Sequence, residues 1–200
     1  MVNNKTIAAA ILAGGKASRL NGIAKGNIVI KKYATTIITH AIKELQESRI
    51  EQIIISANED ASYINYGLPI VKDRCDNCGP FAGIESSLKY YQSRADAVLF
   101  LPCDLPNIST KETTALINFY LEAKCKVVFA AASGNKHTLC AIVDVSCLPE
   151  ITAAINRNIK KIILVWQPLG AKALEFANTD AFVNINTSDD LKLFTEPGFL

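Results

Sequence analysis

The stretch Ile7-Ala-Ala-Ala-Ile-Leu-Ala13, which continues directly into Gly14-Gly-Lys-Ala-Ser-Arg19, decides the fold of this chain. A short run of apolar residues is typical of a strand that is buried on both faces. The run is far shorter than the roughly 20 residues that a membrane span requires, and glycines follow it at once. We therefore predict a central strand over residues 5–13 that ends in a glycine-rich loop.

Similar apolar runs recur along the chain, and segments with helical periodicity separate them. Strands are predicted over residues 52–57, 69–72, 97–103, 126–132 and 139–143. Helices are predicted near residues 36–48, 82–93, 109–123 and 147–158. This alternation predicts an α/β fold, a three-layer α/β/α sandwich with a mostly parallel, Rossmann-like nucleotide-binding sheet.

The last third of the sequence is less regular. Residues 159–169 fit either a helix or a strand, whereas Ala181-Phe-Val-Asn-Ile185 resembles a strand. Thr187-Ser-Asp-Asp190 resembles a capping box that opens a short helix from Leu191 to Phe194. Because no repeat, low-complexity tract or linker divides the chain, we predict a single domain over residues 1–200.

Composition and charge exclude several classes of protein. Of the 200 residues, 50% are apolar, and 21 basic side chains against 19 acidic ones leave a formal net charge of +2. So small a net charge argues against a protein that binds nucleic acid or a membrane surface through a strongly positive surface potential. The first residues lack the pattern of a signal peptide, so we expect a cytoplasmic protein with no membrane partner.

The six cysteines are best explained, for the most part, as small buried hydrophobic residues. Cys75-Asp-Asn-Cys78 has the spacing of a metal-binding or redox pair. A tetrahedral zinc site needs two further ligands, and the sequence has no second pair of this kind. We therefore favour a loop without a metal at this position.

Candidate phosphate-binding residues follow the first predicted strand, at the edge where open α/β sheets bind ligands. Gly14, Gly15 and Gly22 let the backbone approach phosphate oxygens, and Arg19 and Lys25 supply cationic donors. The spacing matches neither the dinucleotide-binding fingerprint nor the phosphate loop of P-loop NTPases. A plain turn with two surface cations is the alternative, but the five residues together favour a phosphate site.

A carboxylate follows the predicted strand over residues 97–103, in Cys103-Asp-Leu-Pro106. Asp104 lies where the chain leaves the sheet, so it can supply an oxygen ligand for Mg²⁺. Alternatively it caps the helix that follows, although Ser109 and Thr110 lie closer to the start of that helix. We favour the metal ligand.

Polar groups also follow the two predicted strands over residues 52–57 and 69–72. Asn58 places an amide at the same edge, where it can read a base, and Asp73 can accept from a ribose hydroxyl or hold metal-bound water. Gly79 would let a flat base lie close to the backbone. A tight turn with a solvated aspartate explains Asp73 equally well.

Four motifs together resemble those of the molybdenum cofactor guanylyltransferases, in the nucleotidyltransferase superfamily: Leu12-Ala-Gly-Gly-x-x-x-Arg19, Gly79-Pro-Phe-Ala-Gly83, Cys103-Asp-Leu-Pro106 and Phe182-Val-Asn-Ile-Asn-Thr187. The first motif occurs in many nucleotidyltransferases, whereas the last is more particular to the molybdenum branch. The resemblance covers nearly the whole chain. It implies a Mg²⁺-dependent enzyme that transfers GMP from GTP to molybdopterin, forming molybdopterin guanine dinucleotide and pyrophosphate.

The resemblance also implies roles for individual residues. The catalytic residues would be Arg19, Lys25 and Asp104, with Mg²⁺ on Asp104. The nucleotide would be bound by Leu12, Ala13, Gly14, Gly15, Lys25, Asn58, Asp73, Gly79 and Asp104. The acceptor would be bound by Asn184, Asn186, Lys160 and Lys161. The N-terminal part would thus mainly hold GTP and the C-terminal part molybdopterin, with molybdenum-insertion proteins and molybdoenzyme chaperones as further partners.

Some positions depart from the family pattern. Asn21 and Ala24 stand where glycine and an acidic residue are frequent, and Lys160 and Lys161 stand where arginine would bind an anion through two hydrogen bonds. Two alternatives therefore stay open: a related nucleotidyltransferase that uses CTP or a sugar or alcohol phosphate, and a catalytically weak nucleotide-binding module. Retention of Lys25 and Asp104 argues against the binding module and favours the transferase.

Overall fold

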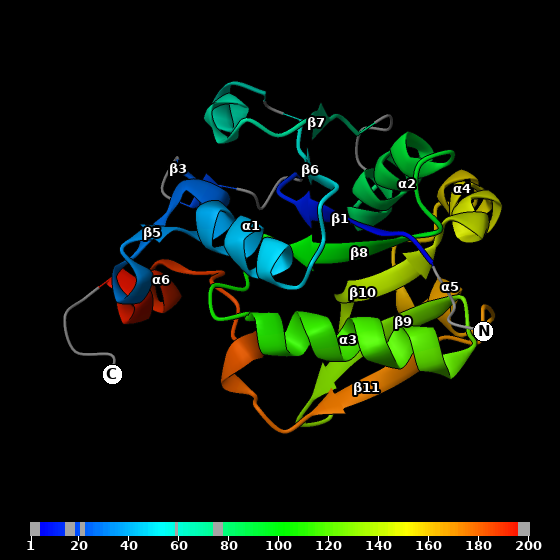
Figure 1. Ribbon diagram of the computed structural model, residues 1–200. Helices are drawn as coiled ribbons and strands as arrows, with labels where there is room; N and C mark the ends of the chain where they lie inside the picture. Colours follow the sequence, from blue (N-terminus) through cyan, green and yellow to red (C-terminus); the bar gives the residue numbers. More distant parts are fainter. Residues whose placement is uncertain (1–4, 15–18, 21–22, 59, 74–77, 196–200) are drawn as a thin grey trace.

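A seven-stranded sheet with helices on both faces forms the centre of the computed structural model, which describes residues 5–14, 19–20, 23–58, 60–73 and 78–195 (Figure 1). The strands are β1 (Ile7–Leu12), β6 (Ile53–Ser56), β7 (Ile70–Val71), β8 (Ala97–Pro102), β9 (Val127–Ala132), β10 (Asn135–Asp144) and β11 (Lys172–Phe176). Their order across the sheet is β11-β9-β10-β8-β1-β6-β7. Neighbouring strands pair in parallel except β10, which runs antiparallel to β8 and β9. The prediction of a mostly parallel sheet is confirmed.

The helices fall into two groups, one on each face of the sheet: α1 (Ile37–Glu47) and α3 (Thr110–Ala123) on the first, and α2 (Pro80–Tyr91), α4 (Leu148–Asn156) and α5 (Ile163–Trp166) on the second. Strand β1 shows the division, because successive side chains of a strand point to opposite faces. Ala9 and Ile11 pack in the core under α1 and α3, whereas Ala8 and Ala10 pack in the core under α2, α4 and α5. The sheet is therefore covered on both sides, as a three-layer sandwich requires.

A smaller region lies beside α1 and includes residues from both ends of the chain (Figure 1). It contains the hairpin of β2 (Arg19–Leu20) and β3 (Ile23–Ala24), the hairpin of β4 (Val29–Ile30) and β5 (Thr35–Thr36), and the C-terminal helix α6 (Ser188–Thr195). Its own apolar cluster contains Ile28, Ile30, Ile37, Ile185 and Phe194. The C-terminal segment is therefore packed against the residues that follow Lys25.

The prediction of a strand over Ala181–Ile185 is wrong. Asp180–Phe182 forms a 3-10 helix, and the residues that follow it belong to no strand. Instead of joining a ladder, the Ile185 N–H donates to the Asp104 carbonyl oxygen at 3.0 Å. This bond holds the segment against the end of β8. Ala181, Phe182 and Ile185 are buried without joining a strand, whereas Val183 is exposed.

Strand β11 is absent from the sequence prediction, and the undecided region before it contains the short helix α5. β11 pairs with β9 at one edge of the sheet, and its residues are exposed or half-buried. An edge strand of this kind carries no continuous apolar run, so the signal that located the central strands is missing.

The capping box at the start of α6 is confirmed. The Asp190 N–H donates to Thr187 Oγ1 at 3.1 Å, and the Asp190 carboxylate accepts the Thr187 N–H at 2.8 Å. These reciprocal bonds satisfy backbone donors at the helix start that have no partner within the helix.

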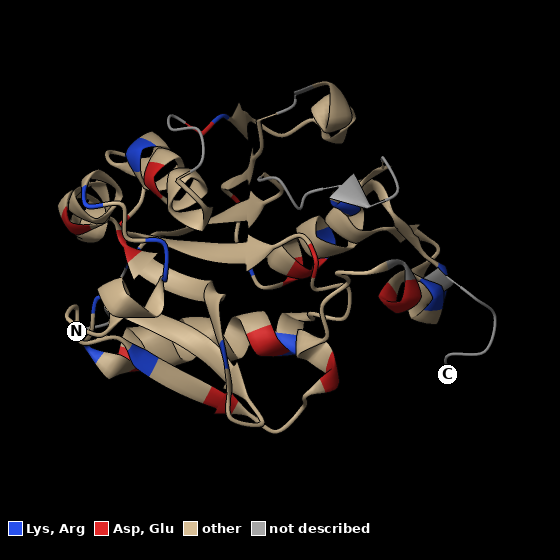
Figure 2. Cartoon of the chain, turned by 180° about the vertical axis from the view of Figure 1, so that it is seen from behind, with Lys and Arg blue, Asp and Glu red and all other residues tan. Residues whose placement is uncertain are grey.

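Acidic and basic residues are interspersed along the helices and loops (Figure 2). In the part of the chain that the structure describes, no helix has both the length and the apolar character needed to cross a membrane.

Candidate active site

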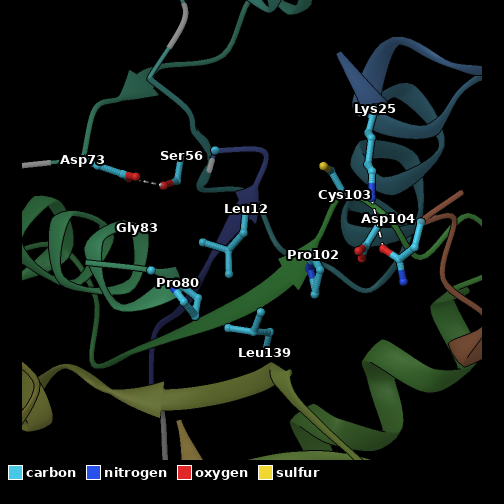
Figure 3. Close-up of a pocket in the computed structure, with 13 residues that line it drawn as sticks. Leu12, Lys25, Ser56, Asp73, Pro80, Gly83, Pro102, Cys103, Asp104 and Leu139 are labelled. Carbon is cyan, nitrogen blue, oxygen red and sulfur yellow. Dashed lines mark hydrogen bonds between the residues drawn. The ribbon is translucent and has the colours of Figure 1, made fainter. Parts of the chain in front are cut away.

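A pocket of about 430 Å³ lies at the carboxyl ends of β1, β6 and β8 (Figure 3). The predicted site residues that line it are Leu12, Gly14, Lys25, Asp73, Gly79, Asp104 and Asn186. The other lining residues are Ser56, Pro80, Gly83, Pro102, Cys103 and Leu139. The polar groups occupy two ends of the pocket, and an apolar middle part separates them (Figure 3).

Asp104 lies two residues beyond the end of β8 and is the acidic group of the first end. Its Oδ2 accepts a hydrogen bond from Asn184 Nδ2 at 3.3 Å, whereas its Oδ1 is buried and has no hydrogen-bond partner among the described residues. Burial raises the pKa of the carboxyl above its ordinary value, and the nearby Lys25 ammonium opposes that rise. A buried oxygen without a partner is what a bound cation would satisfy.

Asp104 does not cap α3, so the alternative role considered for it is wrong. Ser109 occupies the cap position, and the Glu112 carboxylate accepts the Ser109 N–H in a capping box. The carboxylate of Asp104 is therefore available to the pocket.

Lys25 is the basic group of the same end and begins a 3-10 turn, Lys25–Asn27, directly after β3. Only 4% of the residue is exposed, and its Nζ donates to Asn186 Oδ1 at 3.1 Å. Its side chain extends toward Asp104 (Figure 3). A β-carbon at Gly26 would lie 2.5 Å from Ile38 Cδ1, so glycine allows the turn to pack this closely against α1. We call the Lys25 and Asp104 side of the pocket the reaction end.

Asp73 and Ser56 line the opposite side of the pocket. Asn58, a predicted site residue that does not line the pocket, bonds to Asp73, and we call the three residues together the recognition end. Asn58 and Asp73 bond reciprocally: Asn58 Nδ2 donates to Asp73 Oδ2 at 3.3 Å, and the Asp73 N–H donates to Asn58 Oδ1 at 3.0 Å. Ser56 Oγ donates to Asp73 Oδ1 at 3.5 Å. The carboxylate is therefore held in a defined orientation at the ends of β6 and β7.

Gly83 keeps the recognition end tightly packed. A β-carbon at this position in α2 would lie 2.7 Å from Ser56 Oγ, 3.2 Å from Leu12 Cδ2 and 3.4 Å from Asp73 Oδ1. Glycine therefore lets α2 approach the ends of β1 and β6. Gly79, at the start of the same helix, has a φ of +63°, a backbone conformation that favours glycine.

The middle of the pocket is lined by apolar side chains from several elements. Leu12 and Pro102 come from the ends of β1 and β8, Pro80 from the first turn of α2, and Leu139 from β10 (Figure 3). The pairing of β9 with β10 is irregular between His137 and Ala141, which is where Leu139 lies. Such a surface suits a flat ring more than a charged group.

Some predicted site residues lie elsewhere or outside the described residues. Ala13 is buried, and its N–H donates to the Ser56 carbonyl oxygen at 2.8 Å, so it links β1 to β6. Lys160 and Lys161 are exposed between α4 and α5 and do not line the pocket. Gly15 and the side chain of Arg19 lie outside the described residues.

The cysteines give no support for a metal site among the described residues. Cys103, Cys125, Cys140 and Cys147 carry free thiols, and burial raises the pKa of the pocket residue Cys103 to about 12. The interpretation of the Cys75 and Cys78 pair falls partly outside the described residues. No group of three or more His, Cys, Asp or Glu side chains suited to a metal occurs in the described ranges.

Sequence reasoning assigned no site role to the lining residues Ser56 and Leu139 or to the nearby His137. Ser56 ends β6, so the rule that selects polar residues at strand ends could have found it. Leu139 carries no such signal, because only the irregularity in β10 brings it to the pocket. The His137 ring is tilted against Phe182 with ring centroids 4.8 Å apart. Burial lowers the pKa of His137, and the Asp104 carboxylate opposes that shift.

Comparisons with known proteins agree with this geometry. Residues 9–169 match the family model of the MobA-like NTP transferase domain. A molybdenum cofactor guanylyltransferase of Haemophilus influenzae is 30% identical over 190 residues, which cover 94% of this chain and 96% of that protein.

Solved structures share the fold. The molybdopterin-guanine dinucleotide biosynthesis protein A of Archaeoglobus fulgidus has a TM-score of 0.76 at 20% identity, covering 94% of this chain and 96% of that one. A Mycobacterium tuberculosis protein in complex with manganese has a TM-score of 0.70 at 14% identity, covering 96% of this chain and 100% of that one. On the match of most of its length to the family model, the chain belongs to the MobA-like NTP transferase family of nucleotidyltransferase enzymes.

Proposed function

We propose that this enzyme transfers GMP from GTP to molybdopterin, forming molybdopterin guanine dinucleotide and pyrophosphate. One observation carries the proposal: the buried Lys25 ammonium and the half-buried Asp104 carboxylate both line an apolar pocket, and one Asp104 oxygen is buried without a partner among the described residues. This arrangement suits a phosphoryl group that is neutralised from two sides. The guanylyltransferase relative supports the choice of substrates.

The chemistry requires positioning and charge neutralisation. The terminal phosphate oxygen of molybdopterin would attack the α-phosphorus of GTP, and the bond to the β-phosphate oxygen would break as pyrophosphate leaves. The attacking oxygen is already anionic, so no general base is required. Lys25, together with Arg19, would stabilise the charge that develops on the departing pyrophosphate.

A divalent cation fits the reaction end, and we propose Mg²⁺ on Asp104. The buried Oδ1 without a described partner is a hard oxygen ligand of the kind that Mg²⁺ prefers. When bound, the cation would supply further neutralisation of phosphate oxygens. The related structure that contains manganese supports divalent-metal use in this fold.

The recognition end would hold the nucleoside. Asp73 and Asn58 present a carboxylate and an amide, which can accept from and donate to polar edges of guanine or to ribose hydroxyls. Leu12, Gly14 and Gly79 would contact the same nucleotide. Lys160 and Lys161 remain predictions for the acceptor side, as do a cytoplasmic location and the molybdenum-insertion proteins and molybdoenzyme chaperones as partners.

Two assays test the proposal. Calorimetric titration with GTP, CTP, ATP and UTP in Mg²⁺ should show selective binding of GTP that Lys25→Ala weakens. Pyrophosphate should then be released from GTP only when molybdopterin is added. A preference for CTP would point to a cytidylyltransferase, and the absence of nucleotide binding would exclude the proposed transfer.

A further inference from the structure

The segment from Asn184 to Asp190, which we call the strap, runs along the reaction end of the pocket. Asn184 Nδ2 donates to Asp104 Oδ2 at 3.3 Å, and the Ile185 N–H donates to the Asp104 carbonyl oxygen at 3.0 Å. Asn186 Oδ1 accepts from Lys25 Nζ at 3.1 Å. One short segment therefore contacts both charged residues of the reaction end.

Asp190 holds the strap from its other end. Its Oδ2 accepts the N–H groups of Asn186 at 2.9 Å and Thr187 at 2.8 Å. Ile185 is fully buried and belongs to the same apolar cluster as Phe194 and Ile28. The backbone of Asn186 is therefore fixed to α6 and to the region that carries Lys25.

Both partners that the strap supplies are neutral amides. A lysine side chain has several rotatable bonds, so an ammonium that must meet a phosphate at a fixed place benefits from an acceptor that restrains it. An amide oxygen does this without cancelling the positive charge, as a carboxylate would. In the same way, Asn184 orients the Asp104 carboxylate through a neutral donor and leaves its negative charge for a cation.

We propose that the strap positions the two reacting charges, and that Asp190 is a positioning residue for catalysis through Asn186 and Lys25. This inference rests on the proposed transfer reaction. Any contact of Asn184 or Asn186 with the acceptor would come in addition to this role.

Asp190→Ala tests the role of Asp190, with Asp189→Ala as its matched control. Asp189 lies in the same first turn of α6, is exposed, and pairs with Lys192 at 2.8 Å. Its substitution therefore removes one charge and leaves the hydrogen bonds of Asn184, Asn186 and Asp190 in place. Asp190→Ala should lower kcat about tenfold, with KM for GTP and molybdopterin changed by less than about twofold. Asp190→Asn should restore most of kcat, because an amide oxygen can accept the same two N–H groups.

Asn186→Ala tests the same role without touching the helix cap, and it replaces Asp190→Ala if that variant loses its fold by circular dichroism. Asn186→Asp should lower kcat further, about a hundredfold, since a carboxylate would neutralise the ammonium. A second readout does not depend on turnover: the ¹³Cε NMR signal of Lys25, which is assigned by its disappearance in Lys25→Ala. This signal should shift in Asp190→Ala and should keep its position in Asp189→Ala.

Two outcomes would overturn the inference. A rise in KM for molybdopterin at unchanged kcat would show that the strap amides bind the acceptor and do not act through Lys25. An unchanged Lys25 signal together with unchanged kcat would show that the strap does not position the lysine. If the unmodified enzyme released no pyrophosphate, the proposed function would fail, and the NMR comparison would still decide whether the strap restrains Lys25.

Discussion

The two ends of the pocket differ in how their polar groups are satisfied. At the recognition end, Asn58 and Asp73 lie 15 residues apart, follow the neighbouring strands β6 and β7, and bond to each other. At the reaction end, Lys25 and Asn186 lie 161 residues apart, and Asp104 keeps a buried oxygen with no partner among the described residues. At the first end the amide and the carboxylate already bond to each other. At the second end a buried carboxylate oxygen is still available to a ligand. This difference is expected if the nucleoside is recognised at one end and the nucleotidyl group is transferred at the other, where developing charge must be stabilised.

The largest effect should follow from Asp104→Asn, which removes the charge from the reaction end and preserves the shape. Turnover should fall by about 10³-fold or more, since cation binding and phosphate neutralisation are lost together. Pyrophosphate release under saturating substrates measures this. Near-normal turnover in this variant would show that the Asp104 charge is not needed for the reaction, and the proposed difference between the two ends would be wrong.

The same variant should alter the pH dependence of stability. Because the folded-state pKa of Asp104 is raised, the folded protein binds more protons than the unfolded one between the two pKa values. Ionisation therefore costs stability as pH rises through that window, and the cost persists at neutral pH. Urea unfolding at pH 7 should show Asp104→Asn to be at least as stable as the unmodified chain. A clear loss of stability would contradict this assignment.

Lys25→Ala should give the next largest effect, a fall in kcat/KM of about 10²-fold, because one of the charges that neutralise the phosphates is lost. Lys31→Ala is the control, since Lys31 is an exposed lysine of the next 3-10 turn. Steady-state kinetics should leave the control within about twofold of the unmodified enzyme. Equal losses in both variants would indicate a general effect of positive charge.

Gly83→Ala should act on the recognition end alone. The new methyl group would clash with Ser56 Oγ and displace the Asp73 carboxylate that Ser56 bonds. KM for GTP should therefore rise about tenfold, with little change in kcat. The double variant Gly83→Ala with Ser56→Ala removes the closest contact and should recover part of the affinity. A fall in kcat without a change in KM would show that the two ends are not separate.

The smallest effect is expected for Asn58→Ala, which leaves Asp73 without the reciprocal amide. GTP affinity should fall about fivefold, and the preference for GTP over other nucleotides should narrow. Competitive titration with ATP and CTP measures the change. Asn118→Ala, on an exposed face of α3, serves as the control and should leave nucleotide choice unaltered.

The central architecture could be predicted because its signals are local. Continuous apolar runs identified β1, β6, β8 and β9, and the rule that ligands bind at carboxyl strand ends placed Asp104 and Asn58 at one edge. The phenylalanine and isoleucine of the 182–187 motif misled the strand prediction. Their burial comes from packing against separate clusters, which periodicity does not report.

The contacts within the site were beyond sequence reasoning. The bond between Lys25 and Asn186 depends on how α6 packs against the hairpin of β4 and β5, which no spacing encodes. The close approach of Gly83 to Ser56 depends on the distance between α2 and the sheet. Glycine at position 83 was visible in the sequence, but the atom that it makes room for was not.

The strap comes later in the sequence than the two charged residues that it contacts. Lys25 emerges early and Asp104 at mid-chain, whereas Asn186 follows β11, the last strand of the sheet. Domains fold as their segments become available during synthesis. A nascent chain that already holds its entire sheet therefore still lacks the amides that hold the reaction end. Turnover therefore requires that the strap has joined the folded sheet, as well as the sheet itself.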